Sequence, residues 1–125
     1  ARRMVEAMTV KCENEEAPIM SLSGGNQQKV IVARWLMTES NLVILDEPFQ
    51  GVDVKSRSEI GQYLRDNIGT STALVIATDL DEVVDISDRV IVFNQGVMVG
   101  EQEAGEIDKD QLIHLTSQTL EEIFS

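Results

Sequence analysis

Four consecutive apolar residues followed at once by two carboxylates constrain the fold of this chain more than any other feature. The run from Leu42 to Leu45 is typical of a central strand in a parallel sheet, which is covered on both faces. Asp46 and Glu47 come directly after it, and a strand interior does not tolerate two adjacent charges. The strand must therefore end there. We expect the two carboxylates at the carboxyl edge of a sheet, where they can meet a cation.

The rest of the chain alternates between helical and strand patterns. Helices are expected over residues 2–9, 55–68 and 108–118. Another helix is expected to begin after Ser23, which is its N-cap, and Leu80, Val83 and Val84 mark a further short one. Strands are expected over residues 42–45, 73–77, 90–93 and 97–99, and a loop over residues 11–18. Gly69 is the expected C-cap glycine, and Asn94-Gln95-Gly96 the loop of a hairpin. This order predicts an α/β fold with a mainly parallel sheet, flanking helices and a C-terminal β-hairpin.

Charge and composition exclude several classes of protein. The net charge of −12, with only 10 scattered Lys and Arg residues, argues against free nucleic acid as a partner. Cys12 is the only cysteine, which favours a reducing compartment, and His114 is far from it in the sequence. No apolar stretch approaches the ~18 residues needed to cross a bilayer. The sequence therefore predicts a soluble, cytoplasmic chain. Because it opens on a helical pattern without Met, we expect it to be a piece of a longer protein.

The carboxylate pair suits phosphoryl transfer. That reaction depends on positioning and on neutralising charge, so one carboxylate can hold Mg²⁺ while a second group orients the attacking water. We assign Asp46 to the metal, and Glu47 as the general base or the group that orients the water. The residues alone leave an alternative open, in which Asp46 caps a turn and Glu47 faces solvent.

The glycine-containing loop before the second helix has the chemistry of an anion site. The Ser23 hydroxyl can donate to a phosphate, Gly24 and Gly25 allow close approach to the backbone, and a helix N-terminus favours negative charge. An ordinary loop with an N-cap serine remains the alternative. The sequence Gly-x-x-x-x-Gly-Lys-Ser/Thr, which cradles the phosphates of a bound nucleotide, occurs nowhere in the 125 residues.

Three short motifs at fixed spacing resemble those of a known family. Residues 22–30 read LSGGNQQKV, residues 45–48 read LDEP and residues 51–54 read GVDV. Together with Arg34 they resemble the C-terminal half of an ABC transporter nucleotide-binding domain. The closest resemblance is to the ATPases of bacterial monosaccharide importers, which carry two fused nucleotide-binding domains. The ending soon after the last predicted helix fits the second of the two domains.

The resemblance implies a partial P-loop NTPase domain over residues 1–125. Residues 1–38 would be its signature and helical portion, and residues 39–104 would carry the Walker B strand, the D-loop and the switch region. Residues 105–125 would form the C-terminal helix and tail. Without the phosphate loop, the isolated chain is expected to be inactive as an ATPase.

The family's functional residues carry over onto matching positions. Those implied to contact ATP that is bound mainly by the opposing domain are Ser23, Gly24, Gly25, Asn26 and Gln28. Asp46 becomes the Walker B aspartate for Mg²⁺ and Glu47 the catalytic glutamate. Asp53 falls at the D-loop position, which couples the two ATP sites.

Four positions depart from the usual pattern of the family. Asn26 replaces the last Gln of the usual signature, which is the form found in sugar importers. Thr78 stands at the position of the switch histidine, which it cannot replace as a proton carrier near neutral pH. Phe49 and Gln50 stand where this subfamily usually has Thr and Arg, so an apolar ring is expected near the D-loop.

The resemblance also implies partners and a location. A second nucleotide-binding domain and transmembrane permease subunits would complete the machine, with ATP and Mg²⁺ bound in the complete protein. The chain would reach the membrane only through the permease, at the inner face. Two alternatives are a non-catalytic half-domain that completes a partner's ATP site in trans, and an ATPase of the same superfamily that maintains DNA. The sparse basic residues argue against the second.

Overall fold

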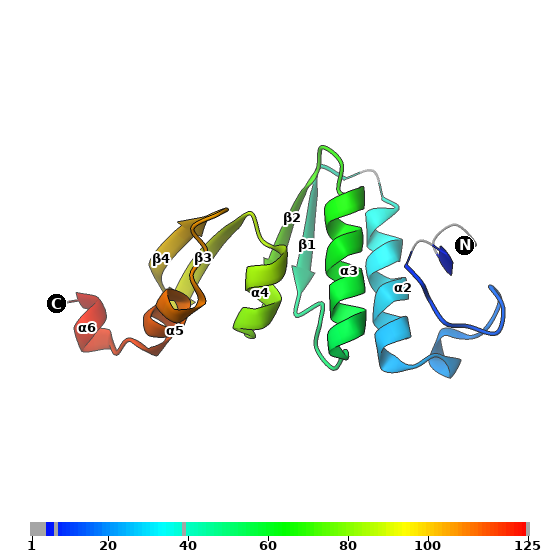
Figure 1. Cartoon of the computed structure of the whole chain (residues 1–125), viewed down its shortest axis with the longest axis horizontal. Coiled ribbons are helices and arrows are strands. Elements are labelled where there is room, and N and C mark those ends of the chain that lie inside the picture. The colour runs from blue at the N-terminus through cyan, green and yellow to red at the C-terminus, as the bar shows by residue number, and fades with distance from the viewer. Residues whose placement is uncertain (1–4, 7, 39, 125) are drawn as a thin grey trace. The chain divides into compact units, whose positions relative to one another are not determined.

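The computed structural model describes residues 5–6, 8–38 and 40–124 of the chain (Figure 1). These residues form two compact units, Ala1–Thr78 and Asp79–Ser125, and each is described by itself. Their elements confirm the predicted α/β class, with one parallel pair of strands and one antiparallel hairpin. In the described part of the chain, no helix is both long and apolar enough to cross a bilayer.

The first unit pairs two parallel strands with two helices. Its elements are the short 3-10 helix η1 (Ile19–Ser21), α2 (Gly24–Leu36), β1 (Leu42–Asp46), α3 (Val54–Asn67) and β2 (Thr72–Ile76). Leu42 lies opposite Thr72, and Asp46 lies opposite Ile76. The helices α2 and α3 lie side by side against one face of the strand pair, and both begin at the end where the strands finish (Figure 1). The predicted parallel pairing and the two helices are therefore present.

The two strands are covered on one face, and the prediction of burial on both faces was wrong for this unit. Val43 and Leu45 are buried, whereas Leu42 and Ile44 are exposed, with Ile44 at 58%. The residues of β2 alternate between exposed and half-buried. The reason is that α2 and α3 flank only one side of the pair, which leaves an apolar second face uncovered.

The ends of α3 follow local rules that the sequence carries. The Asp53 carboxylate caps its first turn by accepting a hydrogen bond of 3.0 Å from the backbone N–H of Ser56. At the other end Gly69, with φ of +60°, follows the C-cap residue Ile68 in the left-handed conformation that glycine favours. The helix begins and ends one residue before the predicted bounds.

The second unit packs a hairpin against a helix. It contains α4 (Leu80–Ile86), β3 (Arg89–Asn94), β4 (Val97–Glu103), α5 (Lys109–Ser117) and α6 (Leu120–Phe124). Val90, Val92 and Leu112 form its buried core. Gln95 and Gly96, with φ of 49° and 83°, make the two-residue turn whose twist matches a hairpin. The predicted hairpin and terminal helix are confirmed, with both strands longer than expected.

Differences from the expected elements are concentrated near the N-terminus. Half of the helix predicted over residues 2–9 lies outside the described residues; Val5 and Glu6 are helical, and a turn follows at Met8. The loop predicted over residues 11–18 is irregular, as expected. The short helix η1 after it was not predicted, because a three-residue 3-10 turn has no hydrophobic period to detect.

Candidate functional site

The polar ends of four elements meet at one end of the first unit. The carboxyl ends of β1 and β2 and the first turns of α2 and α3 lie there (Figure 1). Asp46 is the last residue of β1, and Thr78 comes two residues after the end of β2, where its side chain is exposed. The topology therefore gathers the predicted residues at the edge where ligands of open α/β sheets bind.

Two backbone hydrogen bonds hold Glu47 in place. Its N–H donates to the carbonyl oxygen of Ile76 at 2.8 Å, and its own carbonyl accepts from the N–H of Gln50 at 3.1 Å. Its φ of +46° lies in the left-handed region, which costs a residue with a side chain about 1–2 kcal/mol. The side chain is half-buried, while that of Asp46 is exposed. The fold thus fixes the place of Glu47 at the expense of strain.

Ser23 occupies the N-cap of α2, as predicted, but its hydroxyl does not cap the helix. The oxygen instead accepts a hydrogen bond of 2.8 Å from the side-chain amide of Asn26. A hydroxyl that accepts in this way keeps its own hydrogen to donate. The side-chain oxygen of Asn26 (Oδ1) in turn accepts from the backbone N–H of Lys11 at 3.0 Å. Asn26 therefore orients the Ser23 hydroxyl and ties residue 11 to α2, while Gln28 is half-buried farther along the helix.

Gly25 has no room for a side chain. A Cβ added there would lie 2.7 Å from the Ser56 Oγ atom and 3.2 Å from a methyl carbon of Val52. The equivalent atom at Gly24 would meet nothing closer than the Gly51 carbonyl oxygen, 3.8 Å away. The absence of a side chain at Gly25 therefore allows α2 to approach the start of α3.

We expect Gly25→Ala to lower the free energy of unfolding by about 1–3 kcal/mol, because the added methyl group must displace Ser56 and Val52. Gly24→Ala is the matched control, since the same change has room there and replaces a helical glycine. Urea denaturation followed by circular dichroism measures both. Equal midpoints for the two variants would show that the approach of α2 to α3 is not tight.

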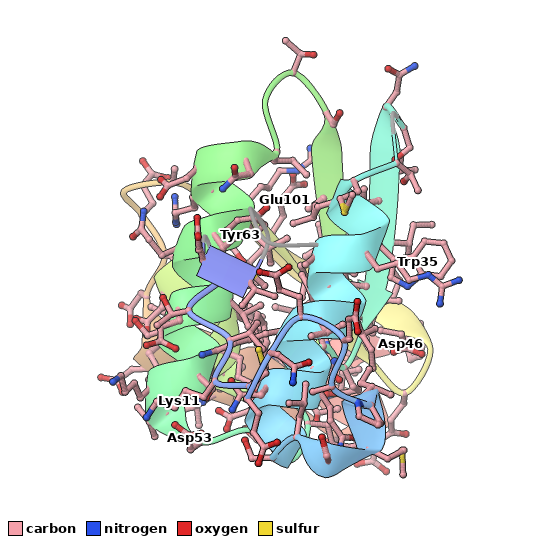
Figure 2. The ribbon with its side chains drawn as sticks, turned by 90° about the vertical axis from the view of Figure 1, so that its right-hand side faces the viewer. Lys11, Trp35, Asp46, Asp53, Tyr63 and Glu101 are labelled. Atoms are coloured by element: carbon pink, nitrogen blue, oxygen red, sulfur yellow. The ribbon has the colours of Figure 1, made fainter. Side chains whose placement is uncertain are left out.

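A polar pocket of about 150 Å³ lies between these helix starts. Its lining residues are Thr9, Lys11, Ser23, Asn26, Lys29, Asp53, Lys55, Ser56 and Glu59. Lys11 and Asp53 come close together there from distant parts of the chain (Figure 2). The Ser56 N–H and hydroxyl both donate to the Asp53 carboxylate, and they lower its pKa below the ordinary value. Asp53 is therefore a carboxylate anion held in place at the start of α3.

The pocket separates the predicted residues into two groups. Ser23, Asn26 and Asp53 line it, whereas Asp46, Glu47 and Thr78 do not. Lys29 and Glu59 form an ion pair across the pocket, and neither was singled out from the sequence. A signal for Lys29 was present: Asn26 and Lys29 continue the buried stripe of Val32 and Ala33 at helical spacing.

The carboxylate at the end of β1 fits Mg²⁺ as one ligand among several. No group of three or more His, Cys, Asp or Glu residues within the described ranges is arranged to hold a metal ion. Mg²⁺ is commonly bound through one or two carboxylates and the oxygens of substrate phosphates. The exposed Asp46 carboxylate supplies one such ligand.

Comparisons with known proteins identify the family. Residues 2–50 match the family model described as ABC transporter. An arabinose import ATP-binding protein of Pseudomonas savastanoi pv. phaseolicola is 41% identical over 116 residues, which are 92% of this chain and 23% of that protein. A ribose import ATP-binding protein of Ruegeria sp. is 38% identical over 120 residues, covering 95% of this chain and 24% of that protein. This chain belongs to the ABC transporter family.

Solved structures agree with this assignment at the level of the fold. A structure of MJ1267, an ATP-binding cassette of an ABC transporter, aligns with a TM-score of 0.72 at 24% identity and covers 98% of this chain. The aligned part is 47% of that cassette. A nucleotide-free ATP-binding cassette from an ABC transporter gives a TM-score of 0.71 over 99% of this chain. The ABC chain described here thus has the fold of about half a cassette, and it spans about 23% of the length of its arabinose-import relative.

Proposed function

We propose that this chain is part of the ATP-hydrolysing subunit that powers sugar import through an ABC transporter. The observation that carries the proposal is its 41% identity, over 92% of its length, to an arabinose import ATP-binding protein. Within that subunit the chain would be the C-terminal part of the second nucleotide-binding domain. Its division at residues 38 and 104 into signature, sheet and tail portions remains a prediction.

The start of α2 has the properties of a phosphate-binding edge. The Ser23 hydroxyl is oriented by Asn26 and keeps a hydrogen to donate, and the first turn of a 13-residue helix presents N–H groups. The close approach of α2 to α3 sets Gly24 and Gly25 against Gly51, Val52 and Ser56, which flank Asp53 in the sequence. We propose that these residues and Gln28 contact an ATP that is held mainly by an opposing domain, and that Asp53 couples the two ATP sites.

The end of β1 has the properties of a hydrolytic edge. When bound there, Mg²⁺ would neutralise charge on the phosphate oxygens. Asp46 would hold the metal through its exposed carboxylate. The Glu47 carboxylate would accept a proton from the attacking water. Two backbone hydrogen bonds, to Ile76 and from Gln50, hold Glu47 in place for this role. Thr78, at the end of the adjacent strand, can donate one hydrogen bond to a phosphate oxygen but carries no proton away.

The proposed partners are a second nucleotide-binding domain and the transmembrane permease subunits, with the chain at the cytoplasmic face of the membrane. The sparse Lys and Arg residues disfavour nucleic acid as a partner.

Transport by the full-length protein tests the proposal. The full-length subunit and its permease are placed in liposomes, and Mg·ATP-dependent uptake of labelled arabinose, ribose and galactose is measured. We expect ATP-dependent uptake of at least one sugar, and none with Asp46→Asn. The isolated 125-residue chain, which has no phosphate loop of its own, is the negative control and should not hydrolyse ATP. Sugar uptake that is independent of ATP, or no uptake of any monosaccharide, would contradict the proposal.

A further inference from the structure

Lys29 carries a charge that is almost completely removed from water. Its side chain is 4% exposed, in the second turn of α2. The ammonium group forms an ion pair with the Glu59 carboxylate of α3, and it also donates to the carbonyl oxygen of Thr9 at 3.4 Å. A buried charge is tolerated only where partners compensate its lost hydration. Both partners lie outside α2, so the charge binds this helix to two other segments of the unit.

The ion pair lies one turn beyond the contact between the two helix starts. Lys29 follows Gly25 by four residues, and Glu59 follows Ser56 by three, so both pairs lie along the same line of contact between α2 and α3. At the first of these levels, Gly25 touches Ser56, whose N–H and hydroxyl hold the Asp53 carboxylate. The separation of α2 and α3 therefore determines where Ser23 lies relative to Asp53.

The space between these two levels is lined by polar side chains, so it adds little apolar packing to the close contact at Gly25. Ser23, Asn26, Asp53 and Ser56 line the pocket of about 150 Å³ there, so polar groups border much of the space between the helix starts. A charged pair with defined partners can add a second constraint one turn farther along the helices, because its attraction depends on the distance between them.

We infer that Lys29 is a positioning residue, which holds the start of α2 at a set distance from Asp53 through its ion pair with Glu59. This inference rests on the proposed function, in which the start of α2 and Asp53 act on a nucleotide together. Lys29 itself touches no reacting atom. Its removal is expected to slow turnover while leaving nucleotide affinity nearly unchanged, since most of that affinity comes from a phosphate loop outside this chain.

Lys29→Met is the appropriate variant. Methionine is unbranched and flexible, so it can fill the space of the lysine stem without the charge. Glu59 would keep a cationic neighbour, because the Lys55 ammonium lies 3.8 Å away on the same helix. Lys109→Met is the matched control: it also removes a lysine from an ion pair, with Asp81, but at an exposed place in the second unit.

The test measures steady-state ATP hydrolysis by the full-length subunit with its permease. We expect Lys29→Met to lower kcat by about ten- to a hundredfold, with KM for ATP within about twofold of the parent. Lys29→Arg should restore most of kcat, and Lys109→Met should leave both parameters unchanged. An unchanged kcat for Lys29→Met, or equal losses in the Met and Arg variants, would overturn the inference.

Two further variants keep the outcome decisive. Where Lys29→Met does not fold, Glu59→Gln gives the same test from the half-buried partner, and its kcat must also fall. Glu47→Gln, measured alongside, distinguishes the inference from the function on which it rests. Turnover that survives Glu47→Gln contradicts the proposed catalytic site, whereas loss in Glu47→Gln with full activity in Lys29→Met overturns the positioning role alone.

Discussion

Glu47→Gln is expected to lower kcat for ATP hydrolysis in the full-length subunit by about 10²–10⁴-fold, the usual contribution of a general base. The substitution keeps the size of the side chain and removes only its ability to take a proton. The backbone should stay in place, because its hydrogen bonds to Ile76 and Gln50 involve main-chain atoms of Glu47. KM for ATP should change little, since this carboxylate acts on water. Steady-state kinetics with saturating Mg²⁺ measure both parameters.

Glu13→Gln is the matched control for this prediction, because Glu13 is an exposed carboxylate in the loop before η1. It should leave kcat unchanged. A Glu47→Gln variant that has the melting temperature of the parent and keeps more than about half of its kcat would mean that another group activates the water. A variant that loses both kcat and thermal stability would instead indicate that the strained backbone at Glu47 depends on the carboxylate.

The features that could be predicted from the sequence are those that local chemistry decides. Two adjacent carboxylates end a strand wherever they stand, and β1 ends at Asp46. Asp53 and Gly69 mark the ends of α3 because a short acidic side chain caps a helix start and glycine tolerates positive φ after its end. The hairpin follows from Gln95 and Gly96 in the same way. Each depends on residues within a few positions of one another.

Apart from the short helix η1, the features that were missed depend on contacts between distant segments. Lys29 and Glu59 are 30 residues apart in the sequence, and Lys11 and Asn26 are 15 residues apart. No local sequence pattern therefore predicts either contact. The same limit explains the uncovered face of the strand pair. An apolar run indicates that a strand can be buried on both sides, but it does not say which segment covers each side.

Phe49 is the departure from the family pattern with the clearest structural consequence. The resemblance predicts only an apolar ring near the D-loop at this position. In the structure the ring is 1% exposed and is among the largest fully buried side chains of the described residues. Its carbonyl oxygen accepts from the N–H of Val52 at 3.1 Å, within the turn that joins β1 to α3. Phe49 therefore anchors the segment between Glu47 and Asp53 in the interior of the unit.

We expect Phe49→Ala to cost about 3–5 kcal/mol of the free energy of unfolding, because it removes a buried ring and leaves a cavity. Phe93→Ala is the control, since Phe93 is 66% exposed in β3, and its cost should stay within about 0.5 kcal/mol. Urea denaturation of both variants measures the difference. Because the anchored segment carries Asp53, the Asp53 cap should loosen as well, which hydrogen exchange at the Ser56 N–H would detect. Equal stability of the two variants would show that the ring is not part of the core that holds this turn.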